Sequence, residues 1–114
     1  MTSLLRALAM AAAGASLAAG SVAAADAEKG KVAYVKNGCF QCHGFAAQGG
    51  VAGPKLAPEP LPYEAFAGYT RTTNRRMPPY SEQILSNEEL ADIYAYVASL
   101  PPPPDPKSIP RLNQ

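Results

Sequence analysis

The segment Cys39-Phe40-Gln41-Cys42-His43 contains both cysteines of the chain and its single histidine. On one helical turn, two thiols three positions apart can each add to a vinyl group of haem, and the adjacent imidazole can reach the iron. This C-x-x-C-H pattern is the attachment signature of c-type haem. A covalently held ring also supplies core that a short chain lacks, so the pattern constrains the fold as well as the chemistry.

Two other interpretations of the cysteine pair compete with haem attachment. A thioredoxin-like redox pair needs a βαβ pattern around it, and no such pattern is visible. A structural disulfide between Cys39 and Cys42 would suit an exported chain, but it would close a very small loop and leave His43 without a role. We therefore expect one covalent haem c, with its iron, attached at Cys39 and Cys42 and ligated by His43.

The first 25 residues differ from the rest of the chain. Arg6 follows a short start, and the uncharged stretch 7–25 is mostly Ala, Leu and Gly and ends in small residues. This layout predicts a secretory signal peptide, residues 1–25, with cleavage after Ala25 and export to the periplasm. The alternative is a retained membrane anchor, because about 20 apolar residues can span a bilayer. The segment is only weakly hydrophobic, so we expect no stable membrane insertion after cleavage.

Charge in the chain is balanced. There are 10 Lys and Arg residues against 9 Asp and Glu, and one of the basic residues is Arg6 in the predicted signal segment. The remainder is therefore neutral in its side chains, which argues against nucleic acid as a partner. Its length indicates one domain, residues 26–100, followed by a proline-rich tail, residues 101–114.

Helix signals recur along this domain. Asp26 and the Asn37-Gly38 pair predict the start and end of a first helix. A loop rich in Gly, Ala and Pro follows up to Leu61, with a turn of helix after Cys39. Pro62 then begins a segment that runs to about Thr72.

The last helix has the clearest signature. Ser86 and Glu89 predict a capping box. The apolar stripe along the helix after the box consists of Leu90, Ile93, Tyr94, Val97 and Leu100. No segment alternates as a strand does, so the fold class is all-α, with three to four short helices and long loops. The tail has six prolines in fourteen residues and predicts polyproline II or disorder, as a solvated extension, a docking arm or a segment folded back on the body.

Met77, in the stretch NRRMPPY, is the only methionine beyond the predicted signal segment. A thioether is a soft, neutral ligand that favours reduced haem iron. The alternative use, gap-filling in the core, suits it less because Pro78 and Pro79 forbid a helix there and no apolar stripe includes it. We expect His43 and Met77 to be the two metal ligands. Without Met77 ligation the protein would be a haem sensor or peroxidase-like.

From Asp26 to Leu100 the chain resembles the class I cytochromes c. In that family a C-x-x-C-H segment is followed by a Gly-Pro-x-Leu loop, here Gly53 to Leu56, then by a methionine ligand and a C-terminal helix. The resemblance implies that the Pro54 carbonyl accepts a hydrogen bond from His43 and that Leu56 presses on the haem. It also implies that the first and last helices cross, at positions matched by Gly30, Tyr34, Ile93 and Tyr96.

The chain departs from the family in a compressed middle and in having no tryptophan. A ring bonded to a haem propionate must then be a tyrosine; the candidates are Tyr63, Tyr69 and Tyr80. Three arginines are propionate partners, docking charges or plain solvated charges: Arg71, Arg75 and Arg76.

The resemblance implies a single-electron carrier that is not itself an enzyme. The R-x-M-P-x-Y segment is similar to small single-haem cytochromes that serve as subunits or partners of periplasmic dehydrogenases. We expect a dehydrogenase as donor and another cytochrome or an oxidase as acceptor. The alternative is a permanent cytochrome subunit of a dehydrogenase complex.

Overall fold

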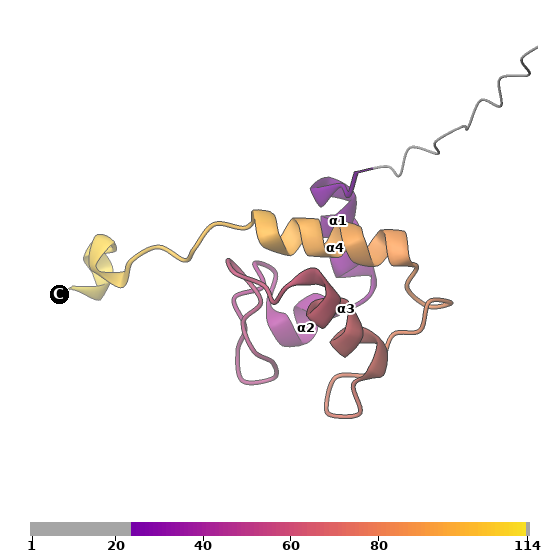
Figure 1. Cartoon of the computed structure of the whole chain (residues 1–114). Helices are drawn as coiled ribbons and strands as arrows, with labels where there is room; N and C mark the ends of the chain where they lie inside the picture. The colour runs from indigo at the N-terminus through magenta and orange to yellow at the C-terminus, as the bar shows by residue number, and fades with distance from the viewer. Residues whose placement is uncertain (1–23, 114) are drawn as a thin grey trace, which may run out of the picture.

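The computed structural model describes residues 24–113, which form helices and loops without strands (Figure 1). The elements are α1 (Ala27–Lys36), α2 (Cys39–His43), α3 (Tyr63–Thr72), α4 (Asn87–Ser99) and the 3-10 turns η1 (Pro106–Ser108) and η2 (Pro110–Leu112). The all-α prediction is confirmed. Apart from its last two residues, the predicted signal segment 1–25 lies outside the described residues. Within residues 24–113, no helix has the length and apolar character needed to cross a membrane.

Local capping signals place the helix starts. The Asp26 carboxylate accepts hydrogen bonds from the main-chain nitrogens of Glu28 and Lys29, at 2.9 and 3.1 Å. The predicted capping box is present, because Ser86 Oγ accepts from the Glu89 nitrogen at 3.1 Å and the Glu89 carboxylate accepts in return. Each such cap stabilises a helix by about 1 kcal/mol. α3 begins one residue later than predicted, because Pro62 adopts an extended ψ of 145° and serves as the N-cap.

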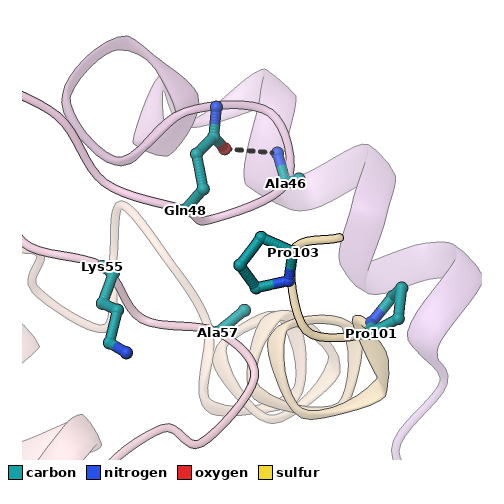
Figure 2. Close-up of a pocket in the computed structure, with 6 residues that line it drawn as sticks. All are labelled: Ala46, Gln48, Lys55, Ala57, Pro101 and Pro103. Atoms are coloured by element: carbon teal, nitrogen blue, oxygen red, sulfur yellow. Dashed lines mark hydrogen bonds between the residues drawn. The ribbon is translucent and has the colours of Figure 1, made fainter. Parts of the chain in front are cut away.

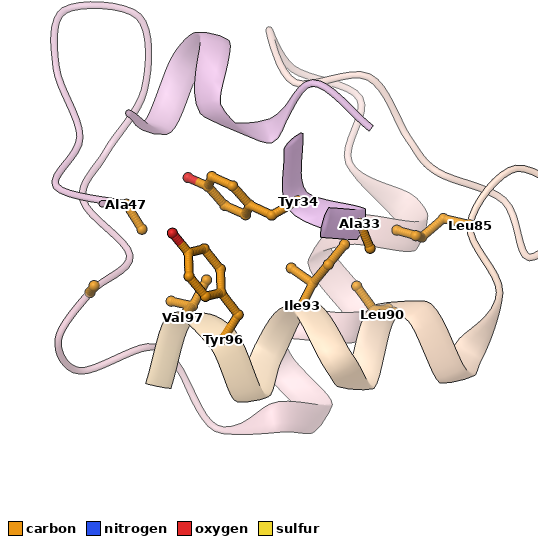
Figure 3. Packing of buried hydrophobic residues seen from close by; sticks show 9 residues of the cluster. Ala33, Tyr34, Ala47, Leu85, Leu90, Ile93, Tyr96 and Val97 are labelled. Atoms are coloured by element: carbon orange, nitrogen blue, oxygen red, sulfur yellow. The ribbon is translucent and has the colours of Figure 1, made fainter. Parts of the chain in front are cut away.

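The core forms where α1 crosses α4 (Figure 3). At Gly30 a Cβ atom would overlap the main-chain oxygen of Asp92, so only glycine permits this close approach. Beside the crossing, the rings of Tyr34 and Tyr96 meet edge to face with centroids 5.4 Å apart. The predicted crossing is therefore present. The buried cluster comprises Ala33, Tyr34, Ala47, Ala57, Leu85, Leu90, Ile93, Tyr96 and Val97.

The buried face of α1 is narrow. Val32 and Val35 are apolar, yet they are 68% and 42% exposed. The buried positions are Gly30, Ala33 and Tyr34; the last two lie three and four residues after Gly30, so all three share one side of the helix. The two valines lie off that side.

The proline-rich tail leaves the body at the end of α4 and ends in two compact turns (Figure 1). The prediction of polyproline II or disorder is wrong for residues 106–112. Asp105 caps η1 by accepting from the Lys107 nitrogen at 2.9 Å. The Asn113 amide donates to the carbonyls of Pro106, Lys107 and Ile109. Proline suits the first position of each turn. The side-chain bonds satisfy the start of η1 and the carbonyls of Pro106, Lys107 and Ile109.

The tail touches the body only near its beginning. Pro101 and Pro103 line a cavity of about 80 Å³ together with four residues of the loop that follows α2 (Figure 2). Those loop residues are Ala46, Gln48, Lys55 and Ala57. From residue 104 to residue 113 all side chains are exposed except the half-buried Ile109. The fold-back alternative therefore describes only the start of the tail, and the rest is exposed, as both a solvated extension and a docking arm would be.

Candidate haem-binding site

α2 carries the three residues of the attachment motif. The helix lies between Gly38 and Gly44, both at positive φ (76° and 79°), so that the chain turns sharply at each end. Cys39 is half-buried and Cys42 is exposed, and both carry free thiols. Because residues three apart share one side of a helix, the two sulfurs lie on the same side of this single turn.

The imidazole of His43 is buried, with 8% of the residue exposed. Its Nδ1 atom lies 2.7 Å from the carbonyl oxygen of Pro54, the contact that the resemblance implies. A carbonyl can only accept, so Nδ1 carries a proton and donates it; in the neutral imidazole Nε2 then keeps a free lone pair. Within residues 24–113, Nε2 makes no hydrogen bond. A bond of this kind orients a metal-ligating histidine and raises its basicity, so the imidazole fits the role of an iron ligand.

The Gly-Pro-x-Leu loop packs directly against this ring. At Gly53, a Cβ atom would lie 3.2 Å from His43 Cε1 and 3.0 Å from the Cys42 carbonyl oxygen. The loop is anchored nearby, because the Gly49 nitrogen donates to the His43 carbonyl at 2.8 Å. Leu56 is half-buried and packs against the core. The absence of a side chain at Gly53 thus allows the Pro54 carbonyl to reach the imidazole.

Three tyrosine hydroxyls hold the main chain on both sides of α2. Before the helix, Tyr80 donates to the carbonyl of Asn37 at 2.8 Å. After it, Tyr34 donates to Gly44 at 2.8 Å and Tyr96 to Phe45 at 2.7 Å. Burial raises the pKa of all three phenols above the ordinary value, so they remain protonated donors at neutral pH.

Tyr80 is therefore not a free propionate partner, which corrects one of the three tyrosine candidates. Its hydroxyl hydrogen is used by the Asn37 carbonyl. Tyr63 packs edge-on against Tyr94, with ring centroids 5.2 Å apart, and Tyr69 is 47% exposed. The two remaining candidates both come from α3.

Met77 is half-buried in the loop that joins α3 to Tyr80. Arg71, at the end of α3, braces this region. Its Nη1 donates to the carbonyls of Tyr80 and Leu85 at 2.8 and 2.7 Å, and its Nη2 donates to Asn87 Oδ1 at 2.8 Å. Arg71 is thus neither a solvated charge nor a docking charge, because main-chain carbonyls occupy its guanidinium.

Arg75 and Arg76, the other two arginines considered, are exposed. They directly precede Met77 in the loop after α3.

A group of half-buried apolar side chains packs against the core cluster. It draws on α2, the following loop, α3, the Met77 loop and the end of α4; its members are Cys39, Phe40, Leu56, Phe66, Ala67, Tyr80 and Leu100. Phe66 and Tyr94 also meet edge to face at 5.2 Å. Apolar side chains that are only half-buried within the chain are the kind of lining that a flat, largely apolar ring requires.

The contact between the rings of Phe66 and Tyr94 is not predictable from the sequence. This contact depends on how α3 lies against α4, and no local sequence pattern predicts that arrangement. The one available signal is the spacing of Tyr63 and Phe66, three apart and so on one side of α3.

The cysteine environment disfavours the thiol-exchange alternative. Burial raises the pKa of the Cys39 thiol to about 11. Exchange-active cysteines have lowered pKa values, because the thiolate is the nucleophile. At neutral pH an unmodified Cys39 would remain a thiol.

The comparison with known protein families agrees with the haem-binding role described above. The match of a cytochrome c family model to residues 25–97, together with the all-α fold, defines a class I c-type cytochrome. That model is described as cytochrome c oxidase, cbb3-type, subunit III, and the chain belongs to this family. No curated protein and no solved structure matches the chain. Family membership makes the protein a haem-binding electron-transfer protein, with haem c and its iron as cofactor.

Proposed function

We propose that this protein carries single electrons between redox proteins of the periplasm, with one haem c attached at Cys39 and Cys42 and ligated by His43 and Met77. When bound, haem iron supplies a reversible one-electron couple. The observation that carries the proposal is the geometry of His43, whose buried imidazole directs its Nδ1–H at the Pro54 carbonyl, 2.7 Å away, so that Nε2 of the neutral ring keeps its lone pair. That is the tautomer an iron ligand needs.

Each residue then has a defined task. Cys39 and Cys42 hold the ring covalently, and the bond to Pro54 strengthens His43 as a ligand. Met77 offers a soft, neutral thioether, which favours the reduced state. With both axial positions filled there is no open position for a substrate, so the protein transfers electrons without transforming a molecule of its own.

Docking in this proposal is weak and transient, with a dehydrogenase as donor and another cytochrome or an oxidase as acceptor. Electron-transfer encounters use small surfaces, so that partners separate quickly. The balance of acidic and basic side chains after residue 25 supports a surface without one dominant sign of charge.

A second candidate is a permanent subunit of an oxidoreductase complex. The family description names an oxidase subunit, and the tail carries its two 3-10 turns away from the body, where they are free to meet another chain. Sizing the native protein from its source distinguishes the two. A free carrier elutes near its own mass, whereas a subunit elutes with its complex.

The proposed function is tested by redox titration and carbon monoxide binding on the purified holoprotein. We expect a single reversible one-electron transition and no carbon monoxide binding to the reduced protein, because Met77 fills the sixth position. Rapid carbon monoxide binding would instead identify a sensor or peroxidase-like protein. Haem that stays with the denatured chain is expected as well; haem lost on denaturation would contradict covalent attachment.

A further inference from the structure

Tyr80 uses all of its polar groups to fix the end of the Met77 loop. Its nitrogen donates to the Thr70 carbonyl at 2.9 Å, and its carbonyl accepts from Arg71 Nη1 at 2.8 Å. Its hydroxyl donates to the Asn37 carbonyl at 2.8 Å. The first two bonds tie Tyr80 to α3, and the third ties it to the segment just before α2.

The third bond joins the two halves of the proposed ligand set. Asn37 precedes Gly38, the N-cap of the helix that carries Cys39 and His43. Tyr80 follows Met77 by three positions. The hydroxyl therefore connects the chain segment of one proposed axial ligand to that of the other, across a sequence separation of 43 residues.

The loop between Thr73 and Tyr80 has little else to hold it. Within the described chain, residues 74–79 make one hydrogen bond, from the Arg75 nitrogen to Thr73 Oγ1, at a long 3.4 Å. Pro78 and Pro79 have fixed φ angles and stand directly between Met77 and Tyr80. A restraint on Tyr80 is consequently passed to Met77 through a stiff segment.

We propose that Tyr80 is a positioning residue for Met77, and that its hydroxyl bond to Asn37 sets how readily the thioether leaves the sixth position. This inference rests on the His43 and Met77 ligation of the proposed function. An external ligand must displace Met77 before it binds, so its apparent affinity is proportional to the population of the opened loop and rises when that population rises. Loss of the hydroxyl bond raises that population.

The test is a titration of the ferric holoprotein with imidazole, followed by the loss of the absorption band of iron–methionine bonding near the red end of the spectrum. Tyr80→Phe removes the hydroxyl and keeps the ring. We expect imidazole to bind about fivefold more tightly than to the wild type, the effect of one neutral hydrogen bond on an equilibrium.

Tyr96→Phe is the matched control. It deletes another phenol hydroxyl bonded to a carbonyl beside α2, that of Phe45, but it has no link to the Met77 loop. We expect a similar loss of thermal stability in the two variants and an imidazole affinity for Tyr96→Phe within about twofold of wild type. This split separates positioning of Met77 from a general loosening of the fold.

An unchanged imidazole affinity in Tyr80→Phe, or an equal change in both variants, overturns the positioning role and leaves the proposed function standing. A wild-type ferric protein without the iron–methionine band overturns both. If Tyr80→Phe does not fold, Arg71→Met replaces it, because Arg71 holds the Tyr80 carbonyl. Tighter imidazole binding by that variant supports the proposal, and unchanged binding contradicts it.

Discussion

At Gly53 the main chain lies close to the imidazole of His43, and the missing side chain is what allows the contact. An added Cβ would sit 3.0 Å from the Cys42 carbonyl oxygen and 3.2 Å from His43 Cε1, tighter than ordinary contact. Such overpacking typically costs about 1–3 kcal/mol.

We therefore expect Gly53→Ala to lower the free energy of unfolding of the holoprotein by about 2 kcal/mol, measured by denaturant unfolding. Gly50→Ala is the control in the same loop, because a Cβ there meets no atom within 4 Å. Equal stability of the two variants would show that the loop does not pack against His43 as described.

The residues of the site differ in how far sequence predicts them. The motif Cys39 to His43 is contiguous, so its chemistry is legible without a structure. Arg71 is different, because its acceptors include the main-chain carbonyls of Tyr80 and Leu85. Every residue has such a carbonyl, so the sequence does not indicate which ones Arg71 will bind. Its role appears only once the end of α3 is placed beside those carbonyls.

Among the elements, the crossing of α1 and α4 is the contact on which the body depends. Gly30→Ala would gain about 1 kcal/mol of helix propensity, but its Cβ would overlap the Asp92 carbonyl, which is main chain and cannot rotate away. We expect a net loss of about 2 kcal/mol in the free energy of unfolding, seen as a lower denaturation midpoint.

Gly68→Ala on α3 is the matched comparison, because a Cβ at that position meets nothing within 4 Å. Propensity alone then acts, and we expect stabilisation of up to about 1 kcal/mol. Opposite signs for the two substitutions support the crossing. Stabilisation by Gly30→Ala would argue against it.

The start of α1 makes a second prediction, which depends on the proposed cleavage after Ala25. The Asp26 nitrogen donates to Asp92 Oδ1 at 2.6 Å. Cleavage would convert that amide into an ammonium group, and a charge-assisted hydrogen bond is roughly twice as strong as a neutral one. We expect the cleaved chain to be more stable, by about 1 kcal/mol, than a chain that keeps several residues before Asp26.

Thermal unfolding of the two forms measures this difference. Asp92→Asn should remove most of it, because the neutral amide cannot form the ion pair. A difference that survives Asp92→Asn would assign the effect to the extra residues themselves.

Element ends are predictable where their determinants are local. The Asp26 cap and the Ser86–Glu89 box lie within three residues of the nitrogens they satisfy, and both are present. The two turns of the tail are not predictable from local sequence, because Asn113, which lies beyond them, completes their hydrogen bonds. The proline content of the tail alone predicts only an extended or disordered segment.

At the scale of the whole molecule, balanced charge shapes the encounter with redox partners. With acidic and basic side chains equal in number after residue 25, we expect electron-transfer rates to change by less than about threefold between about 0.01 and 0.15 M ionic strength. Stopped-flow kinetics with a purified redox partner measures this.

A steep fall of the rate with salt would instead indicate an electrostatic docking site. The exposed Arg75 and Arg76 beside Met77 are then the residues to neutralise first. Arg71 serves as the contrast, because its guanidinium is already bonded within the fold.

The central claim, that Met77 is the sixth ligand of a haem iron held by His43, is tested most directly by the ferric absorption spectrum of wild type and Met77→Ala holoprotein. We expect the iron–methionine band in wild type and its loss in Met77→Ala. The reduction potential should also fall, by on the order of 0.1 V, a part of the roughly 0.8 V that axial ligands span. Absence of the band in wild type, or its survival in Met77→Ala, would contradict the electron-carrier account.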